Sequence, residues 1–385
     1  MRTIRLLLRF IITVLALSVV TFLITGGFWY MWQNARGKTP QIRYTITSAK
    51  LERAALGLYL RYRGSDVTEP ANPNDHREMI FTIEPGDPVI TIAYRLQNMG
   101  LVKDAELFRR VVQYWGTDAT IQAGVYILRP DMTMEEIMRE LQHGRLPSIT
   151  VTIPEGWRAE EIAALLEEKG VTSAEAFLDA VHQGRTDLPF LQDRPAGSGT
   201  SVEGFLFPDT YQFPENAAPE RIVEIMLQNW GLRVPESVWR KGAQDRGMTV
   251  YEVVTLASIV EREAVVSAER PVIAGVYLNR LKEGMYLQAD PTVQYAKGYD
   301  PKTGKWWNTM LQEEANTVLS PYNTFLHGGL PPGPICNPGL GAIMAVLQPA
   351  EHDYLFFYAK GDGSHVFAKT YEEHLENQRL YGGGR

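Results

Sequence analysis

The sequence predicts an α+β protein built from an N-terminal transmembrane helix, a small βααβ subdomain and a larger domain of mixed α/β structure. Three observations predict this arrangement: a long uncharged apolar run near the N-terminus, a strand-helix-helix pattern that occurs twice after residue 79, and helical and hairpin patterns beyond residue 200. At 385 residues the chain exceeds the usual size of a single domain. We therefore expect a tail over 1–9, the membrane helix over 10–32, a juxtamembrane linker over 33–78, the subdomain over 79–148 and the large domain over 149–385.

The apolar run Phe10 to Trp32 is uncharged and long enough to cross a bilayer as a helix. Arg2, Arg5 and Arg9 precede it, and a basic flank favours the cytoplasmic side. No convincing A-x-A cleavage site lies within it, so an uncleaved anchor is favoured over a cleaved signal peptide. The expected location is the cell (inner) membrane, with a single span, the N-terminus in the cytoplasm and the rest of the chain outside it.

Composition and missing motifs exclude several classes of function. The net charge of −7 argues against a nucleic-acid-binding surface. Cys336 is the only cysteine, so an intrachain disulfide is impossible, and we expect a small buried side chain there rather than a nucleophile. The histidines show no metal-ligand spacing, and neither a G-x-S-x-G elbow nor a P-loop is present. We expect no metal and no cofactor.

The chain contains an internal repeat. Thr82-Ile83-x-x-Gly86 with Ile92-Ala93 recurs 70 positions later as Thr152-Ile153-x-x-Gly156 with Ile162-Ala163. Each copy predicts a strand, a glycine turn and two helices, and the first copy adds a closing strand at Ala123 to Leu128 and a helix at Met132 to His143. A further helix is expected in the linker, at Ser48 to Arg63.

The first copy resembles the start of a LysM module, a small βααβ fold that often binds glycans containing N-acetylglucosamine. The resemblance rests on Ile83-Glu-Pro-Gly-Asp87 and on Ile92-Ala93. Whether this unit binds glycan or serves as a spacer stays open.

The helix predicted from Thr249 to Ala264 carries the main catalytic candidate. Thr249-Val-Tyr-Glu252 has the pattern of a capping box. Glu261 falls inside the apolar arc, where burial tends to raise a carboxyl pKa and so favours a general acid. Glu263, at the far edge of the arc, is the rival. A purely structural role, in which both glutamates pair with Arg262 or Arg270, remains open.

Four later segments carry polar side chains or loop and hairpin patterns that a hydrophobic core alone does not require. Glu203 to Tyr211 places Glu203, Asp209 and Tyr211 around a hydrophobic strand, and Gln288 to Thr292 has the pattern of a helix start with Asp290 as N-cap. The Gly- and Pro-rich loop Asn316 to Gly339 carries Tyr322, Asn323 and Asn337. A β-hairpin over 354–370 is expected to end the sheet of the domain.

In chain order, several segments resemble the endolytic murein transglycosylases of the MltG (YceG-like) family. These segments are Glu203 to Tyr211, Leu256 to Glu261, Tyr277 to Leu281, Gln288 to Thr292, Ser320 to Thr324 and Gly329 to Gly339. The resemblance covers roughly residues 79 to 370 and includes the anchor. It implies a lyase that cuts peptidoglycan strands internally at the MurNAc-GlcNAc β-1,4 bond, leaves 1,6-anhydroMurNAc ends and ends strand elongation. It also implies peptidoglycan synthases (penicillin-binding proteins) as partners.

The resemblance implies Glu261 as the catalytic residue, both donating a proton to the leaving oxygen and taking one from the C6 hydroxyl. Gln288, Tyr322, Asn323, Glu203, Asp209 and Tyr211 would bind the substrate. Two alternatives are a hydrolytic muramidase, which would use Glu261 with Asp290 or Asp209, and a non-catalytic glycan-binding scaffold of the cell-wall synthesis machinery.

Overall fold

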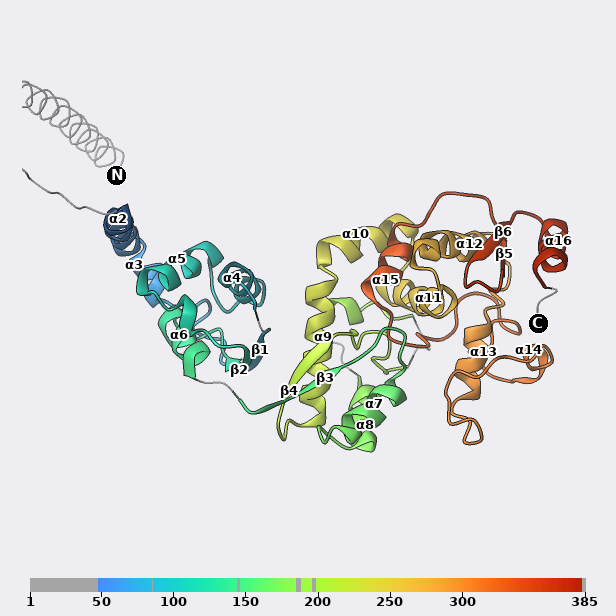
Figure 1. Cartoon of the computed structure of the whole chain (residues 1–385), viewed down its shortest axis with the longest axis horizontal. Coiled ribbons are helices and arrows are strands. Elements are labelled where there is room, and N and C mark those ends of the chain that lie inside the picture. The colour runs from blue at the N-terminus through green and yellow to red at the C-terminus, as the bar shows by residue number, and fades with distance from the viewer. Residues whose placement is uncertain (1–47, 85, 144–145, 185–187, 196–198, 383–385) are drawn as a thin grey trace, which may run out of the picture. The chain divides into compact units, whose positions relative to one another are not determined.

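The computed structural model describes residues 48–84, 86–143, 146–184, 188–195 and 199–382 (Figure 1). It divides into two units, residues 1–62 and 63–385. In the first unit the described segment is helix α2 (Ser48–Tyr62), which confirms the helix predicted in the linker. The predicted membrane span at 10–32 lies outside the described residues. Within the described residues, no helix combines the length and the apolar character needed to cross a bilayer.

The second unit begins with α3 (Gly64–Thr68) and a first βααβ unit. Its elements are β1 (Met79–Ile83), α4 (Val89–Asn98), α5 (Ala105–Trp115), the short η1 (Asp118–Thr120) and β2 (Gly124–Leu128), followed by α6 (Met134–His143). β1 and β2 pair antiparallel, from Met79 with Leu128 to Ile83 with Gly124. The predicted element order is confirmed, while its assignment to the LysM class stays a prediction.

The second copy of the repeat also forms a closed βααβ unit, which the sequence did not predict. It consists of β3 (Ser148–Thr152), α7 (Ala159–Glu168), α8 (Ala174–Gln183), the short η2 (Pro189–Leu191) and β4 (Thr210–Pro214). β3 and β4 pair antiparallel, from Ser148 with Pro214 to Thr152 with Thr210. The hydrophobic strand expected at 203–211 is wrong except for its last two residues, because the backbone amides of Gly204 and Leu206 donate to the Asn337 side chain instead of to a neighbouring strand.

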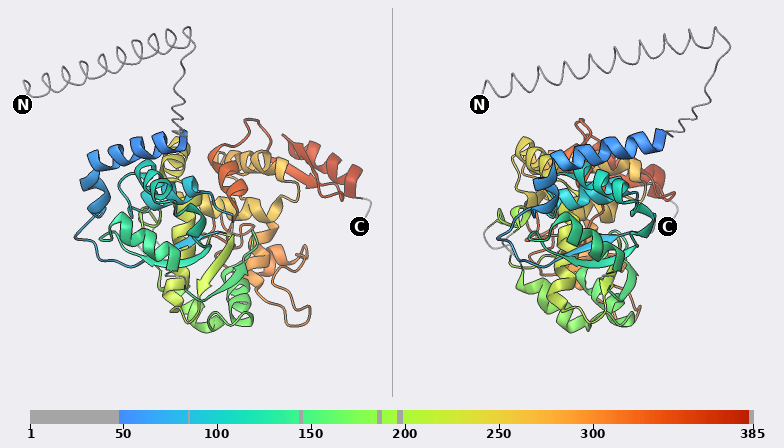
Figure 2. Two further views of the ribbon diagram at one scale, coloured as in Figure 1. Left: turned by 60° about the vertical axis from the view of Figure 1, so that its left-hand side comes forward. Right: turned by 90° about the vertical axis from the view of Figure 1, so that its left-hand side faces the viewer.

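The remaining chain is mainly helical (Figures 1 and 2). Its elements are α9 (Pro219–Arg233), α10 (Glu236–Arg246), α11 (Val250–Glu263), η3 (Ser267–Glu269), α12 (Arg270–Lys282), α13 (Asp290–Lys297), α14 (Glu314–Thr317), α15 (Leu340–Leu347), β5 (Phe356–Ala359), β6 (His365–Ala368) and α16 (Tyr371–Tyr381). α11 is the central helix, since α10, α12, α13 and α15 all pack against it.

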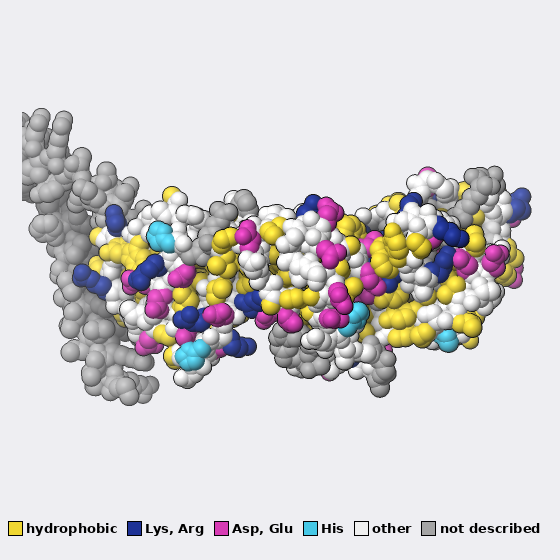
Figure 3. All heavy atoms as spheres, turned by 90° about the horizontal axis from the view of Figure 1, so that it is seen from below, with side chains coloured by type: hydrophobic (Ala, Val, Ile, Leu, Met, Phe, Trp, Pro, Cys, Tyr) yellow, Lys and Arg dark blue, Asp and Glu magenta, His cyan; other side chains and the backbone are white. Residues whose placement is uncertain are grey.

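The predicted C-terminal hairpin is present as β5 and β6, but these strands form a two-stranded sheet of their own instead of ending a larger one. α16 follows and packs against both strands. On the face in Figure 3, acidic and basic side chains alternate with hydrophobic ones. Cys336 is fully buried, and its thiol donates to the Ser258 carbonyl at 3.3 Å, in agreement with the expected filler role.

Candidate active site at the end of helix α11

The sequence of α11 explains why the helix starts where it does and why it lies in the core. Thr249 Oγ1 accepts from the Glu252 amide at 3.2 Å, and the Glu252 carboxylate accepts from the Thr249 amide at 2.7 Å. This is the predicted capping box, and it satisfies two of the amides that a helix start leaves free. Nearly every residue from Val250 to Val260 is buried. The helix thus presents only its last turn, with Glu261 and Glu263, near the surface.

Both carboxylate oxygens of Glu261 are occupied by protein groups. Oε1 accepts from Arg270 Nη2 at 2.6 Å, and Oε2 accepts from the Gly339 amide at 3.0 Å. The side chain is only 5% exposed. Burial raises the pKa of Glu261, while the Arg270 charge and the Gly339 hydrogen bond lower it. The pairing with Arg270 is the structural role that the sequence left open for this residue.

The Gly339 contact depends on a close approach of two chain segments. A Cβ atom at Gly339 would lie 2.0 Å from Glu155 Oε1, so the half-exposed Glu155 side chain would have to move to admit a larger residue. Asn337 fixes the same stretch of loop: its Nδ2 donates to the Trp157 carbonyl at 3.0 Å, and its Oδ1 accepts the Gly204 amide at 2.8 Å. The end of the predicted functional loop is therefore a structural clamp on α11.

Glu263 lies in a different environment. Oε1 accepts from the Tyr277 hydroxyl at 2.8 Å. Oε2 accepts no hydrogen bond from the described residues, and it is not among the fully buried polar atoms that lack a partner. Burial raises the pKa of Glu263 to about 7, Asp290 adds to the increase, and Tyr277 and Arg280 oppose it. Glu263 can therefore hold a proton near neutral pH and has one oxygen left to contact a substrate.

The start of α13 faces Glu263 and is held in an unusual backbone conformation. Gln288 has a φ of 48°, a region that residues other than glycine seldom adopt and that is common at functional sites. Its amide donates to the Thr324 carbonyl at 3.1 Å. Arg280, 8% exposed, donates to the Leu287 carbonyl at 2.7 Å. These contacts with neighbouring segments of the same chain fix the backbone position of Gln288, whose side chain is exposed.

Asp290 does not act as the N-cap that the sequence predicts. The helix starts at Asp290 itself, Ala289 occupies the N-cap position, and no side chain makes a capping hydrogen bond there. Ala289 has the extended backbone of an N-cap residue, and Thr324 Oγ1 accepts from its amide at 3.0 Å, which ties the loop to the start of the helix. Asp290 is exposed, and its charge acts on Glu263.

The other predicted substrate-binding residues lie apart from Glu263 or are buried in structural contacts. Asn323 is fully buried, and its Nδ2 donates to the carbonyls of Ala315 at 3.0 Å and Val318 at 2.9 Å. These hydrogen bonds hold the loop together, and sugar binding by Asn323 stays a prediction.

Glu203, 6% exposed, accepts from the Ala159 amide and from the Tyr295 hydroxyl, both at 2.7 Å. Burial raises the pKa of Glu203 to about 7. Tyr322 packs on the Tyr295 ring at a centroid distance of 4.8 Å, so the structure brings these two predicted residues together. Glu203 and Tyr322 line a cavity of about 310 Å³ that does not include Glu261 or Glu263.

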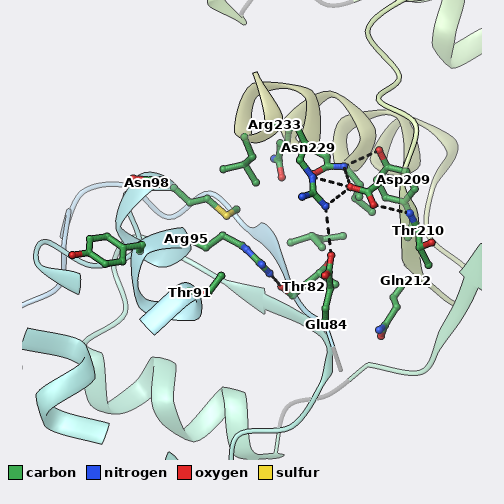
Figure 4. Close-up of a pocket in the computed structure, with 17 residues that line it drawn as sticks. Thr82, Glu84, Thr91, Arg95, Asn98, Asp209, Thr210, Gln212, Asn229 and Arg233 are labelled. Carbon is green, nitrogen blue, oxygen red and sulfur yellow. Dashed lines mark hydrogen bonds and ion pairs between the residues drawn. The ribbon is translucent and has the colours of Figure 1, made fainter. Parts of the chain in front are cut away.

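Asp209 and Tyr211 lie together in another part of the domain. Asp209 Oδ2 accepts from Arg233 Nη2 at 2.5 Å and from Asn229 at 2.9 Å (Figure 4), and the buried Tyr211 hydroxyl donates to the Phe207 carbonyl. Sequence reasoning named Arg270 as a possible partner of the glutamates but missed Tyr277 and Arg280. The available signal was the segment Tyr277 to Leu281, which stood out as a motif without an assigned role. In the described part of the chain, no group of three or more His, Cys, Asp or Glu side chains is arranged to hold a metal ion.

The comparisons with known proteins agree on one family. The model of the YceG-like family matches residues 81–380. A Bacillus subtilis (strain 168) protein named endolytic murein transglycosylase is 32% identical over 329 residues, covering 83% of this chain and 89% of that protein. A protein of the same name from Streptococcus pneumoniae (strain ATCC BAA-255 / R6) is 32% identical over 338 residues, and the match covers 81% of this chain but 60% of that longer protein.

A crystal structure of a YceG-like protein from Listeria monocytogenes has the same fold, with a TM-score of 0.51 and 29% sequence identity. The match covers 78% of this chain and 98% of that chain. The chain described here belongs to the YceG-like family.

Proposed function

We propose that this protein is an endolytic murein transglycosylase, a lyase that cuts the glycan strands of peptidoglycan internally. The relatives that carry this name cover most of the chain. The observation that carries the chemistry is the carboxyl group of Glu263: burial raises its pKa to about 7, and its Oε2 accepts no hydrogen bond from the described residues.

Glu263 supports the role of proton donor better than Glu261 does. A general acid needs a pKa near the working pH and hydrogen-bond reach to the leaving oxygen. Each Glu261 oxygen already accepts one hydrogen bond, from Arg270 and from the Gly339 amide. The Arg270 charge also favours its anionic form. Glu261, the residue predicted from the sequence, would then serve as an anionic anchor that holds Gly339 and the end of α11 in place.

The finer proposal is cleavage of the MurNAc-GlcNAc β-1,4 bond with formation of a 1,6-anhydroMurNAc end. Glu263 donates its proton to the bridging oxygen as the bond from that oxygen to C1 of MurNAc breaks. The resulting carboxylate then takes the C6 hydroxyl proton as O6 bonds to C1, so no water is consumed. A single carboxyl group is enough because the substrate supplies its own nucleophile, unlike the two-carboxylate arrangement of glycoside hydrolases.

A hydrolytic muramidase remains the second candidate, and one observation favours it. Asp290 is close enough to raise the pKa of Glu263, so a second carboxylate faces the proposed acid. Mass spectrometry of the products of purified peptidoglycan separates the two reactions. Anhydro ends, lighter by one water than reducing ends, support the transglycosylase, whereas reducing ends overturn it in favour of hydrolysis. No cleavage at all by the folded protein favours the non-catalytic scaffold.

The cellular setting is part of the same proposal. The apolar run 10–32 would anchor the chain in the membrane with residues 33–385 outside the cytoplasm, and the enzyme would end the elongation of nascent strands beside a peptidoglycan synthase. The support is the basic flank before the run. A reporter fused after Arg385 is expected to be active only outside the cytoplasm, and cytoplasmic activity would contradict the topology.

A further inference from the structure

The tyrosine that binds the proposed acid is itself in contact with the C-terminal hairpin. The buried Tyr277 side chain donates from its hydroxyl to Glu263 Oε1 at 2.8 Å. The Phe357 ring of β5 meets the Tyr277 ring at 90°, with 5.7 Å between the ring centroids, which is a favourable edge-to-face arrangement. Because the hydroxyl lies at the far end of the side chain, a small rotation of the tyrosine carries it out of hydrogen-bond range. The contact with Phe357 limits that rotation.

The chain that leads into β5 is bound along α12, beside which the hairpin lies (Figure 1). Asn279 Nδ2 donates to the carbonyls of His352 at 2.8 Å and Tyr354 at 3.0 Å. Arg280 Nε donates to the Leu355 carbonyl at 2.6 Å. These three hydrogen bonds come from the α12 segment that stood out in the sequence without an assigned role. They fix the start of the hairpin on the helix that carries the tyrosine.

The second strand of the hairpin is bound to η3, the short helix between α11 and α12. The Glu269 carboxylate accepts from the His365 amide at 3.1 Å and from His365 Nδ1 at 2.7 Å. The His365 side chain is only 6% exposed. Its ring meets the Phe357 ring at 88°, with 5.4 Å between the centroids. Phe357 therefore contacts both the tyrosine of the proposed site and a histidine that two hydrogen bonds hold in place.

We infer that Phe357 is a positioning residue for the proposed reaction: held by the His365–Glu269 pair, it keeps the Tyr277 hydroxyl on the carboxyl group of Glu263. The inference rests on the proposed function for the catalytic role of that carboxyl group. Phe357 acts through Tyr277, since its own ring carries no polar atom and exchanges no proton. The hairpin thus belongs to the machinery of the site, although it supplies no catalytic residue.

The groups that act on Glu263 show what the loss of Phe357 should do. The hydrogen bond from Tyr277 and the charge of Arg280, both on α12, lower the pKa of Glu263, whereas burial and Asp290 on α13 raise it. Replacing Phe357 by Leu keeps a large apolar side chain and so keeps most of the burial, but it removes the flat ring that meets Tyr277. The hydrogen bond then forms less often, and the pKa of Glu263 rises.

The test uses the full chain in detergent, labelled with isotopic glutamate, and follows the Glu263 carboxyl by NMR as the pH is varied. The Glu263 signal is identified by its loss in Glu263→Gln. Phe357→Leu should move the titration midpoint upward by about 0.5–1 pH unit, a part of the change expected when a hydrogen bond to a charged group is lost completely. In a Tyr277→Phe background the same replacement should leave the midpoint where it is, because the hydroxyl through which Phe357 acts is absent.

Tyr358→Leu is the matched control on the same strand. Tyr358 follows Phe357 directly, and its ring meets that of His374 on α16, with 6.2 Å between the centroids, so its loss should not move the midpoint. A second pair of variants tests the contact with η3. His365→Ala should move the midpoint upward, and His365→Asn, whose side-chain amide can still donate to Glu269, should restore it.

An unchanged midpoint in the folded Phe357→Leu protein overturns the inference. An equal upward shift with and without the Tyr277 hydroxyl also overturns it, because Phe357 would then act on Glu263 by another route. Failure of His365→Asn to restore the midpoint contradicts the role of the His365–Glu269 pair.

The titration needs no turnover, so the proposed function is read separately, by release of anhydro ends from peptidoglycan. If the parent protein cleaves strands and Phe357→Leu leaves the midpoint unchanged, only this inference fails. If the parent protein releases no ends while the midpoint moves as expected, only the proposed function fails.

Discussion

Replacing Glu263 by Gln tests the proposed chemistry most directly. A glutamate with an ordinary pKa of 4.5 is only about 0.3% protonated at pH 7, whereas a pKa of about 7 makes about half of the Glu263 side chains acidic. Burial therefore increases the population of the acid form roughly 150-fold, and Gln abolishes proton transfer while keeping the shape. We expect release of anhydro ends, followed by liquid chromatography and mass spectrometry, to fall by about 10²- to 10⁴-fold. The fold should persist, because Gln can still accept from Tyr277.

Glu261→Gln is the matched control on the same helix turn. Gln keeps an acceptor for the Gly339 amide but removes the charge that pairs with Arg270, whose side chain is 15% exposed. Breaking a buried pair is costly, and Glu155 at 3.5 Å from Arg270 offsets part of the loss, so we expect a decrease of about 1–3 kcal/mol in the free energy of unfolding. Cleavage by the folded fraction should stay within about tenfold of the parent. The reasoning is refuted if Glu261→Gln, shown to be folded by its melting curve, loses cleavage while Glu263→Gln keeps it.

Three further predictions follow from contacts in the same domain. Tyr277→Phe removes the hydrogen bond that lowers the pKa of Glu263, so the alkaline limb of the rate profile should move to higher pH, and a shift to lower pH would contradict this geometry. Burial raises the pKa of Glu203 from 4.5 to about 7, so between these pH values the native state binds more protons than the unfolded state, and the stability falls as the pH rises. Glu203→Gln should remove up to about 3 kcal/mol of this pH dependence, measured by urea titrations at pH 4.5 and 7. An unchanged pH dependence of stability would count against this reasoning. Asn323→Ala should cost about 2–4 kcal/mol of unfolding free energy by chemical denaturation, because the buried Asn323 side chain makes three hydrogen bonds, while the folded protein keeps its cleavage rate. A large loss of cleavage without loss of stability would instead favour sugar contact.

Local patterns in the sequence predicted the elements well. The capping box at Thr249 and the helix it starts are as predicted, because a helix start depends on residues within one turn. The repeat likewise predicted both pairs of helices. The second closing strand, β4, was missed because 26 residues separate it from the end of α8 at Gln183. Its pairing with β3 depends on tertiary contacts that local periodicity does not report.

The choice between the two glutamates shows where sequence reasoning stops. Helical periodicity placed Glu261 inside the apolar arc and Glu263 at its edge, and both side chains do have raised pKa values. Periodicity cannot show which partner each carboxylate meets. Arg270 and Gly339 are 9 and 78 positions from Glu261 in the chain, and Tyr277 is 14 positions from Glu263. These contacts lower the two pKa values against the effect of burial, and they come from segments that helical periodicity does not report.

The clamp formed by Asn337 has a consequence for the synthesis of the protein. Asn337 and Trp157 are 180 positions apart, yet the Asn337 amide donates to the Trp157 carbonyl at 2.8 Å, and its side chain completes the hydrogen bonding of Gly204 and Leu206. Ribosomes build the chain from the N-terminus, so α11 is made long before the residues that clamp it. An unfinished chain that lacks residues after 336 has Glu261 without the Gly339 amide and α11 without α15. Lytic activity should therefore arise only after almost the entire chain has been synthesised.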